Sequence, residues 1–326
     1  MKNHLLTFVV FTAFIFCLST KLYSQNSSPD STKQQFDSTT QIPDLSKQPS
    51  ELAGQPSNLQ QQPAKAGIHP YNVNIWLSGS IALAGGVANF LGIPSLLHKQ
   101  NISALEIQNL NRDIIRGFDR WALNLDPSNT AIYTTLGDVT MDLCLAAPAA
   151  LAFNKKVKQD WGKMLIMYLE TMSLTSDVYT ISFLGPHYQN KFRPVVYYEA
   201  VPYATKLDGN NRNSFYSGHA AATAAATFFL TKVYCDYHPD LGGKKYLLYI
   251  AASIPPLLCG YFRVMSLRHF PSDVMAGFGI GAVCGILIPE IHLIKLKNKD
   301  MALGLSTSGG VAGVGLTWRP GSGSGK

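Results

Sequence analysis

The stretch from Tyr261 to Asp273 places an arginine, a histidine and a carboxylate at fixed spacing beside a long apolar run. Pro271 suits the first turn of a helix, where a missing backbone N–H costs nothing, so we expect a helix to begin between His269 and Asp273. Asp273 would then lie one turn beyond His269 and bond to one ring nitrogen. The other nitrogen could act as a nucleophile or base, while Arg263 offers a planar donor to an oxyanion.

Two stretches further upstream carry matching chemistry. Ser217, Gly218 and His219 run directly into an Ala-rich segment. A helix that begins there exposes free N–H groups and the positive end of its dipole, which predicts an anion site. Arg193 precedes Pro194 at the end of another apolar run and adds a second guanidinium. Taken singly, these arginines and histidines could equally be structural groups that cap hydrophobic helices.

In the order, separation and helix-end placement of these motifs, the chain resembles the type 2 phosphatidic acid phosphatase and vanadium haloperoxidase superfamily. The matching motifs are Arg193-Pro194, Ser217-Gly218-His219 and Arg263-x5-His269-x3-Asp273. The resemblance implies metal-independent hydrolysis of a phosphomonoester or pyrophosphate through a phosphohistidine, with no cofactor. It implies that His269 attacks phosphorus, that Asp273 orients it and that His219 protonates the leaving oxygen. The phosphoryl oxygens would be held by Arg193, Arg263, Ser217 and the Gly218 N–H.

The chain departs from the family pattern at three positions. The lysine that normally begins the first motif is replaced by Pro186, the proline of the second motif by Tyr216, and the serine of the third by Phe262. The missing lysine removes one phosphate-binding charge. Our hypothesis for a substitute is Lys191, whose ammonium on its flexible stem would reach the same oxygen from the other side of the loop.

Alternative functions follow from the same residues. Relatives hold vanadate with this set of side chains and oxidise halides, so a haloperoxidase is one alternative. The missing lysine allows another, a degenerate protein that binds anionic lipid without turnover. A lipid phosphate or prenyl diphosphate substrate is favoured, because the openings between apolar helices would admit acyl or prenyl chains.

Four carboxylates in the apolar segments raise the question of a metal. Asp138 and Asp142 lie one helical turn apart, and Glu170 and Asp177 lie two turns apart. In a membrane such groups face the bundle interior or water. Structural hydrogen bonding is favoured over metal binding, and no metal site is predicted.

Composition points to a membrane. The chain has 326 residues, of which 14% are charged, against roughly 25% in ordinary soluble domains. The formal net charge of +7 suits an anionic surface or phosphate substrates, but no basic block with interleaved aromatics indicates nucleic acid. The five cysteines lie singly in or beside apolar segments, which favours buried thiols over metal ligands.

Four regions follow one another along the chain. Residues 1–25 read as a signal peptide, with an uncleaved anchor helix as the alternative. Residues 26–70 are rich in Gln, Ser and Pro and predict a disordered linker. Residues 71–298 form the predicted helical domain, and residues 299–326 a tail with a short hairpin around Gly309-Gly310.

The helical domain is predicted to be all-α, a membrane-embedded bundle of about six hydrophobic helices. They are expected near residues 75–97, 131–153, 164–184, 217–234, 246–262 and 273–295. Between the first two, Leu105 to Leu125 has the pattern of one amphipathic helix. Small residues at Gly277, Gly281 and Gly285 predict close packing of the last helix on the Ala-rich fourth helix.

The lysine distribution predicts the orientation. All three motifs fall at one end of the bundle, and the other end carries Lys155, Lys156, Lys158, Lys163, Lys244, Lys245, Lys295, Lys297 and Lys299. The positive-inside rule then places the motifs on the periplasmic side of the inner membrane. Six full spans after an exported N-terminus would place them in the cytoplasm, so we expect the first segment, with its glycines and Pro94, to be re-entrant or peripheral. A soluble periplasmic bundle is the alternative, and the sequence predicts no oligomeric state.

Overall fold

The computed structural model describes residues 69–115, 117–297, 301–308 and 311–318. The predicted signal peptide and almost all of the predicted linker lie outside these residues. The helical part begins after an extended segment in which Tyr71 and Val73 are buried. Tyr71 donates a hydrogen bond of 2.5 Å to Asp236, which ties this segment to the bundle.

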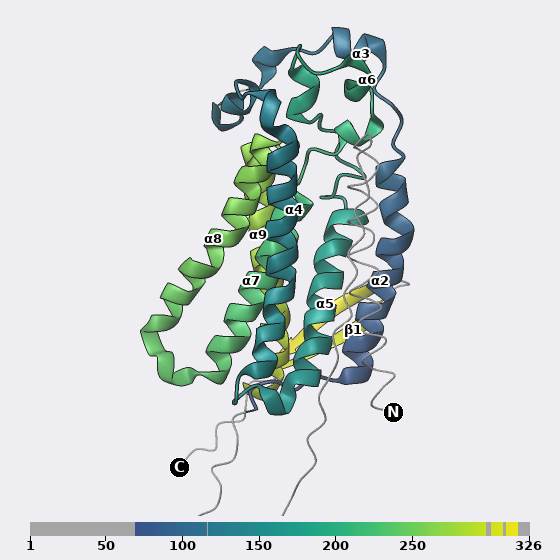
Figure 1. Ribbon diagram of the computed structural model, residues 1–326. Helices are drawn as coiled ribbons and strands as arrows, with labels where there is room; N and C mark the ends of the chain where they lie inside the picture. Colours follow the sequence, from purple (N-terminus) through teal and green to yellow (C-terminus); the bar gives the residue numbers. More distant parts are fainter. Residues whose placement is uncertain (1–68, 116, 298–300, 309–310, 319–326) are drawn as a thin grey trace, which may run out of the picture. The chain divides into compact units, whose positions relative to one another are not determined.

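Six long helices account for most of the described residues. They are α2 (Ile75–Leu97), α4 (Thr130–Ala146), α5 (Trp161–Thr180), α7 (Gly218–Tyr237), α8 (Lys245–Met265) and α9 (Pro271–Lys297). Each falls on one of the expected segments, so the prediction of a bundle of about six apolar helices is confirmed. Consecutive helices alternate in direction (Figure 1). The N-termini of α4, α7 and α9 therefore lie at one end, near α3 (Ala104–Gln108) and α6 (Tyr203–Lys206).

Helix α7 lies at the centre and packs against α9, α8, α4 and α5. Fifteen of its 20 residues are buried, and most in its first half are Ala or Thr. A Cβ atom added at Gly281 of α9 would overlap the carbonyl of Ala221, and one at Gly285 would overlap that of Ala225. The predicted close packing of these helices is confirmed, and it depends on glycine because the two backbones are in contact.

Four stretches are long and apolar enough to cross a membrane: Ile75–Leu97, Pro127–Phe153, Pro239–Met265 and Pro271–Leu293. Large apolar side chains lie exposed on them, for example Phe90, Leu143 and Ile250. Exposure of such apolar faces to water is unfavourable, whereas contact with the hydrocarbon chains of a lipid bilayer is not. The length and composition of these helices indicate an integral membrane protein.

The glycines and Pro94 do not interrupt the first segment as a helix, and its re-entrant or peripheral placement stays a prediction. Helix α2 continues without a break through Pro94 to Leu97 and qualifies as a span by length and composition. Gly85 faces Ser173 and Asp177 of α5, where a Cβ would overlap their side chains. The glycine therefore permits close helix packing at this point.

The single amphipathic helix predicted over Leu105 to Leu125 is wrong. Helix α3 ends at Gln108, and two 3₁₀ helices follow, Arg112–Ile114 and Gly117–Leu123. The Asn111 side chain accepts a 2.8 Å hydrogen bond from the Asp113 N–H and starts a new turn. Gly117 has φ of 59°, in the left-handed region that stops a helix. Local capping overrides the apolar periodicity here.

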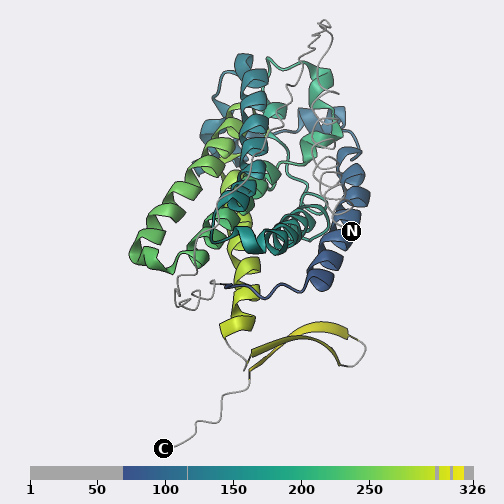
Figure 2. The same ribbon diagram turned by 60° about the horizontal axis from the view of Figure 1, so that its bottom comes forward.

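Two strands near the C-terminus, β1 (Met301–Ser308) and β2 (Val311–Trp318), form an antiparallel hairpin. Met301 lies opposite Trp318, and Ser308 lies opposite Val311. Figure 2 shows the two strands side by side. They fall in the region where the sequence predicts a hairpin.

Candidate active site

The three motifs occupy one end of the bundle. The first lies in the segment between α5 and α6, the second at the start of α7, and the third runs from the last turn of α8 to the first turn of α9. Ser217 is the N-cap of α7, and its Oγ accepts a 3.4 Å hydrogen bond from the Ala220 N–H. A Cβ at Gly218 would lie 3.1 Å from the Tyr179 ring, tighter than ordinary contact. The short loop between α8 and α9 carries His269 and ends at Pro271, which is the first residue of α9 as predicted.

The His269 ring is buried, with 2% of its surface exposed. Its Nδ1 lies 2.6 Å from the backbone carbonyl oxygen of Ser214. Since a carbonyl can only accept, Nδ1 carries the proton and Nε2 keeps its lone pair. Burial, followed by the charges of Arg193 and Arg263, holds the pKa of His269 well below its usual value. The ring is therefore neutral near pH 7, as a nitrogen nucleophile must be.

The predicted bond between Asp273 and the His269 ring is wrong. Asp273 Oδ2 accepts hydrogen bonds from Ser214 Oγ at 2.6 Å and from the Phe270 N–H at 2.9 Å. Its Oδ1 lies 2.6 Å from Lys191 Nζ. These donors engage both carboxylate oxygens, and the imidazole bonds to the Ser214 carbonyl instead. Asp273 is thus linked to His269 through Ser214, whose hydroxyl donates to the carboxylate and whose carbonyl accepts from the ring.

The Lys191 ammonium is surrounded by acceptors. Besides Asp273, it contacts Asp119 at 3.3 Å and Ser272 Oγ at 3.1 Å. Asp119 also accepts from the N–H and the hydroxyl of Ser272, at 2.8 and 2.6 Å, and so caps the start of α9. A phosphate contact by Lys191 stays a prediction, because in this arrangement its charge faces carboxylates.

Both predicted guanidiniums are buried. Arg193 is 3% exposed and Arg263 is 1% exposed. The Arg263 Nη1 donates to Asp138 Oδ1 at 3.1 Å, while its Nε has no hydrogen-bond partner among the described residues. Besides burial, the charges of both arginines lower the pKa of His219 and of His269, so the four side chains interact electrostatically. Such a cluster of buried cations suits an anionic ligand.

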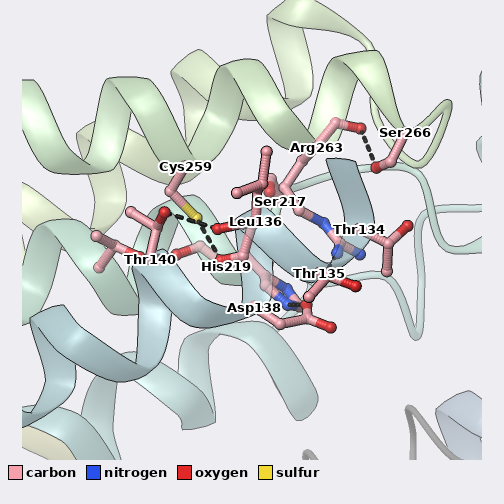
Figure 3. Close-up of polar contacts among 12 residues, drawn as sticks. Thr134, Thr135, Leu136, Asp138, Thr140, Ser217, His219, Cys259, Arg263 and Ser266 are labelled. Atoms are coloured by element: carbon pink, nitrogen blue, oxygen red, sulfur yellow. Dashed lines mark hydrogen bonds and ion pairs between the residues drawn. The ribbon is translucent and has the colours of Figure 1, made fainter. Parts of the chain in front are cut away.

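Asp138 of α4 links the second and third motifs. Its Oδ1 lies 2.9 Å from His219 Nε2 and 3.1 Å from Arg263 Nη1 (Figure 3). The sequence analysis did not place Asp138 in the site. The available signal was its pairing with Asp142 in an apolar helix, which marked it as a carboxylate facing the interior.

Two other carboxylates in the apolar helices form hydrogen bonds within the bundle. Asp177 Oδ1 accepts from Asn89 at 2.7 Å, and Glu170 lies 2.9 Å from His292 Nε2. Among the described residues, no group of three or more His, Cys, Asp or Glu side chains is arranged to hold a metal ion. These contacts match the structural interpretation that the sequence favoured for Glu170 and Asp177.

The part of the chain that carries these motifs is similar to known proteins. Residues 165–296, which include all three motifs, match the sequence model of the PAP2 superfamily. Over 160 residues, or 48% of this chain, the sequence is 28% identical to lipid A 1-phosphatase of Porphyromonas gingivalis, and the match covers 31% of that relative. A solved transmembrane PAP2 type phosphatidylglycerolphosphate phosphatase from Bacillus subtilis is 20% identical, with a TM-score of 0.38 over 68% of this chain and 97% of that one.

Proposed function

Because this chain belongs to the PAP2 superfamily, we propose that it is a phosphatase that hydrolyses a lipid phosphate through a phosphohistidine. One observation carries the proposal: a buried, neutral imidazole with a fixed tautomer lies within the electrostatic influence of two buried guanidiniums. Hydrolysis of a phosphate ester needs a nucleophile that is not protonated and donors for the equatorial oxygens. His269 supplies the first, and Arg193 and Arg263 supply the second.

In the first step, His269 Nε2 attacks phosphorus while the bond between phosphorus and the leaving oxygen breaks. The electron pair of that bond goes to the leaving oxygen, which takes a proton from His219. The guanidiniums and the Ser217 and Gly218 end of α7 hold the charge on the equatorial oxygens. The product is a phosphoramidate on His269 and a free lipid alcohol.

In the second step, water attacks the phosphorus of the phosphohistidine. His219, now neutral, takes a proton from that water, and the bond between phosphorus and Nε2 breaks with its electron pair returning to His269. Inorganic phosphate leaves, and both histidines regain their initial states. No redox change or co-reactant other than water is required.

The substrate is proposed to be a lipid that carries a phosphomonoester or a diphosphate. A relative is named for its action on lipid A, so a lipid A 1-phosphate is the first substrate to test. The exposed apolar faces of α2, α4 and α8 suit contact with acyl chains. We propose that the site faces the periplasm and that α2 does not cross the membrane as a full span, because Lys155, Lys156, Lys244 and Lys245 lie at the opposite end of the bundle.

A second candidate is a protein that binds anionic lipid without turnover. It is favoured by the proline at position 186 and by the engagement of Lys191 with two carboxylates. A site with one cation fewer stabilises the transition state less. The arrangement of His269 is unaffected by this loss, which is why hydrolysis is the first proposal.

A substrate panel tests the proposal. Purified protein in detergent would be given lipid A 1-phosphate, phosphatidic acid, prenyl diphosphate, and bromide with vanadate and peroxide. We expect phosphate release from at least one lipid and none from the His269→Ala variant. Lipid binding without release would favour the second candidate, bromination would indicate a haloperoxidase, and release that survives His269→Ala would contradict the mechanism.

A further inference from the structure

From the contacts of Asp138 in α4, we infer that this carboxylate is the positioning residue of the acid, His219. It sets the orientation and the ionisation of the imidazole that protonates the leaving oxygen. This inference rests on the proposed function and adds a residue that lies outside the three motifs.

Asp138 contacts two side chains to which the proposed mechanism gives roles, His219 and Arg263. Its Oδ1 lies within hydrogen-bonding distance of His219 Nε2, at 2.9 Å, and of Arg263 Nη1, at 3.1 Å. Figure 3 shows the three side chains converging from α4, α7 and α8. A carboxylate oxygen only accepts at this distance, so Nε2 of His219 is the protonated nitrogen. The remaining nitrogen, Nδ1, is the atom that can exchange a proton with the substrate.

The backbone beside Asp138 is adapted to this contact. The preceding residue is Gly137, and a Cβ there would lie 3.0 Å from Cδ of Arg263. The Arg263 side chain therefore passes α4 closely on its way to Asp138. Cys259 Sγ also contacts the Gly137 carbonyl, at 3.5 Å, which fixes α8 against this turn of α4.

Charge explains why an acid at this place needs a carboxylate. Burial and the charge of Arg263 lower the pKa of His219 to about 4, and Asp138 opposes both by its hydrogen bond and its charge. Without Asp138 the imidazole would lose the acceptor that opposes burial and the charge of Arg263, and it would hold a proton less readily. With Asp138, the imidazolium is stabilised when an anionic phosphoryl group adds its own negative charge.

The proton step is then complete. As the bond from phosphorus to the leaving oxygen breaks, the proton moves from Nδ1 of His219 to that oxygen, and the imidazole becomes neutral while Nε2–H stays on Asp138. In the second step, Nδ1 takes a proton from the attacking water. Asp138 remains ionised throughout and touches no reacting atom.

The test compares two leaving groups on one lipid. Asp138→Asn would be assayed with the lipid phosphate that the wild type hydrolyses and with its phosphorothiolate analogue, in which sulfur replaces the leaving oxygen. A thiolate leaves without a proton, whereas an alkoxide needs one. We expect kcat/KM, which reports the step in which the leaving group departs, to fall about 100-fold for the oxygen ester and to stay close to wild type for the sulfur ester.

The pH profile gives a second readout that loss of structure would not produce. Removing the carboxylate lowers the pKa of His219 further, so the alkaline limb of kcat for the oxygen ester should move to lower pH. In a His219→Asn background, Asp138→Asn should cause no additional loss. The matched control is Asp142→Asn, one turn further along α4, which should leave the ratio of the two esters unchanged.

Equal losses on both esters in a variant that elutes like the wild type would overturn the inference. If Asp138→Asn aggregates, Asp138→Glu replaces it, because it keeps the charge and displaces the oxygen. A wild-type protein that hydrolyses no lipid phosphate would instead refute the proposed function, and with it the role of His219 as an acid. If the wild type is active and Asp138→Asn slows both esters equally, only the positioning role of Asp138 is refuted.

Discussion

At the residue scale, the reactive state of His269 depends on a backbone carbonyl. Ser214 offers its carbonyl oxygen to Nδ1 at 2.6 Å and its hydroxyl to Asp273 at 2.6 Å. Residues of the α9 start and of the loop before α7 are thereby joined in one network. Asp273 stabilises the loop that holds the imidazole, so its loss should misplace His269 even without a direct bond.

The lowered pKa of His269 predicts the acidic limb of the pH profile. A histidine with its usual pKa of 6.5 would be half protonated, and half inactive as a nucleophile, at pH 6.5. Because burial and two guanidiniums lower this pKa, protonation requires a lower pH. We expect kcat/KM, which reports the free enzyme, to show no decrease as the pH falls through 6.5. An acidic limb centred at or above that value would contradict this account of the site.

Lys191 is predicted to act on kcat through Asp273. Its Nζ lies 2.6 Å from Asp273 Oδ1, so Lys191→Ala removes the charge that fixes this carboxylate. We expect a fall in kcat of about tenfold with little change in KM. Arg193→Ala should instead abolish measurable turnover, since it removes a donor to the phosphoryl group. A large rise in KM for Lys191→Ala would show that the ammonium binds phosphate directly, as the sequence hypothesis held.

At the element scale, the contact between α7 and α9 positions the site. It brings Ser217 next to the start of α9, where the Ser217 N–H donates to the Asp273 carbonyl at 3.0 Å. The small-residue pattern predicted this packing, because spacing of four residues places glycines on one helical face. The same reasoning failed between Leu105 and Leu125, where Asn caps and Gly117 break a sequence that is periodic in its apolar residues.

Gly281 provides a test of the helix contact. Gly281→Ala should destabilise the protein by about 1–3 kcal/mol, since the added methyl group overlaps the Ala221 carbonyl and forces the helices apart. The matched control is Gly279→Ala on the same helix, where nothing lies within 4 Å of the added atom. Thermal unfolding in detergent should show a lower midpoint for Gly281→Ala only. Equal midpoints for both variants would argue against backbone contact at this position.

At the scale of the whole molecule, much of the site was predictable because its motifs lie at helix ends that apolar runs reveal. The convergence of Arg193, Ser217 and His269 follows from the order of the helices and their alternating directions. The roles of Ser214 and Asp138 were not predictable, since they depend on which carbonyl or carboxylate packs within hydrogen-bonding distance. Likewise, sequence spacing suggested that Asp273 reaches His269, but competing donors decide where a carboxylate points.

The orientation in the membrane can be tested by cysteine labelling. Ala204→Cys lies on α6 at the motif end of the bundle, and Lys155→Cys lies at the lysine-rich end; both positions are exposed. In spheroplasts treated with a membrane-impermeant maleimide, we expect Ala204→Cys to be labelled at once and Lys155→Cys only after permeabilisation. The native cysteines in the described residues are buried or partly buried, and the wild type controls for them. The reverse pattern would place the site in the cytoplasm.

The most direct measurement is to trap the phosphorylated protein during turnover of the lipid that it hydrolyses fastest. Protein mixed with that lipid would be quenched in alkaline denaturant, where a phosphoramidate survives, and its peptides would be analysed by mass spectrometry. We predict one phosphoryl group on the peptide that contains His269 and none in His269→Ala. In His219→Asn the amount should be larger if the substitution slows the attack of water more than the first step. Turnover without phosphate on His269, or phosphate on another residue, would contradict the central claim.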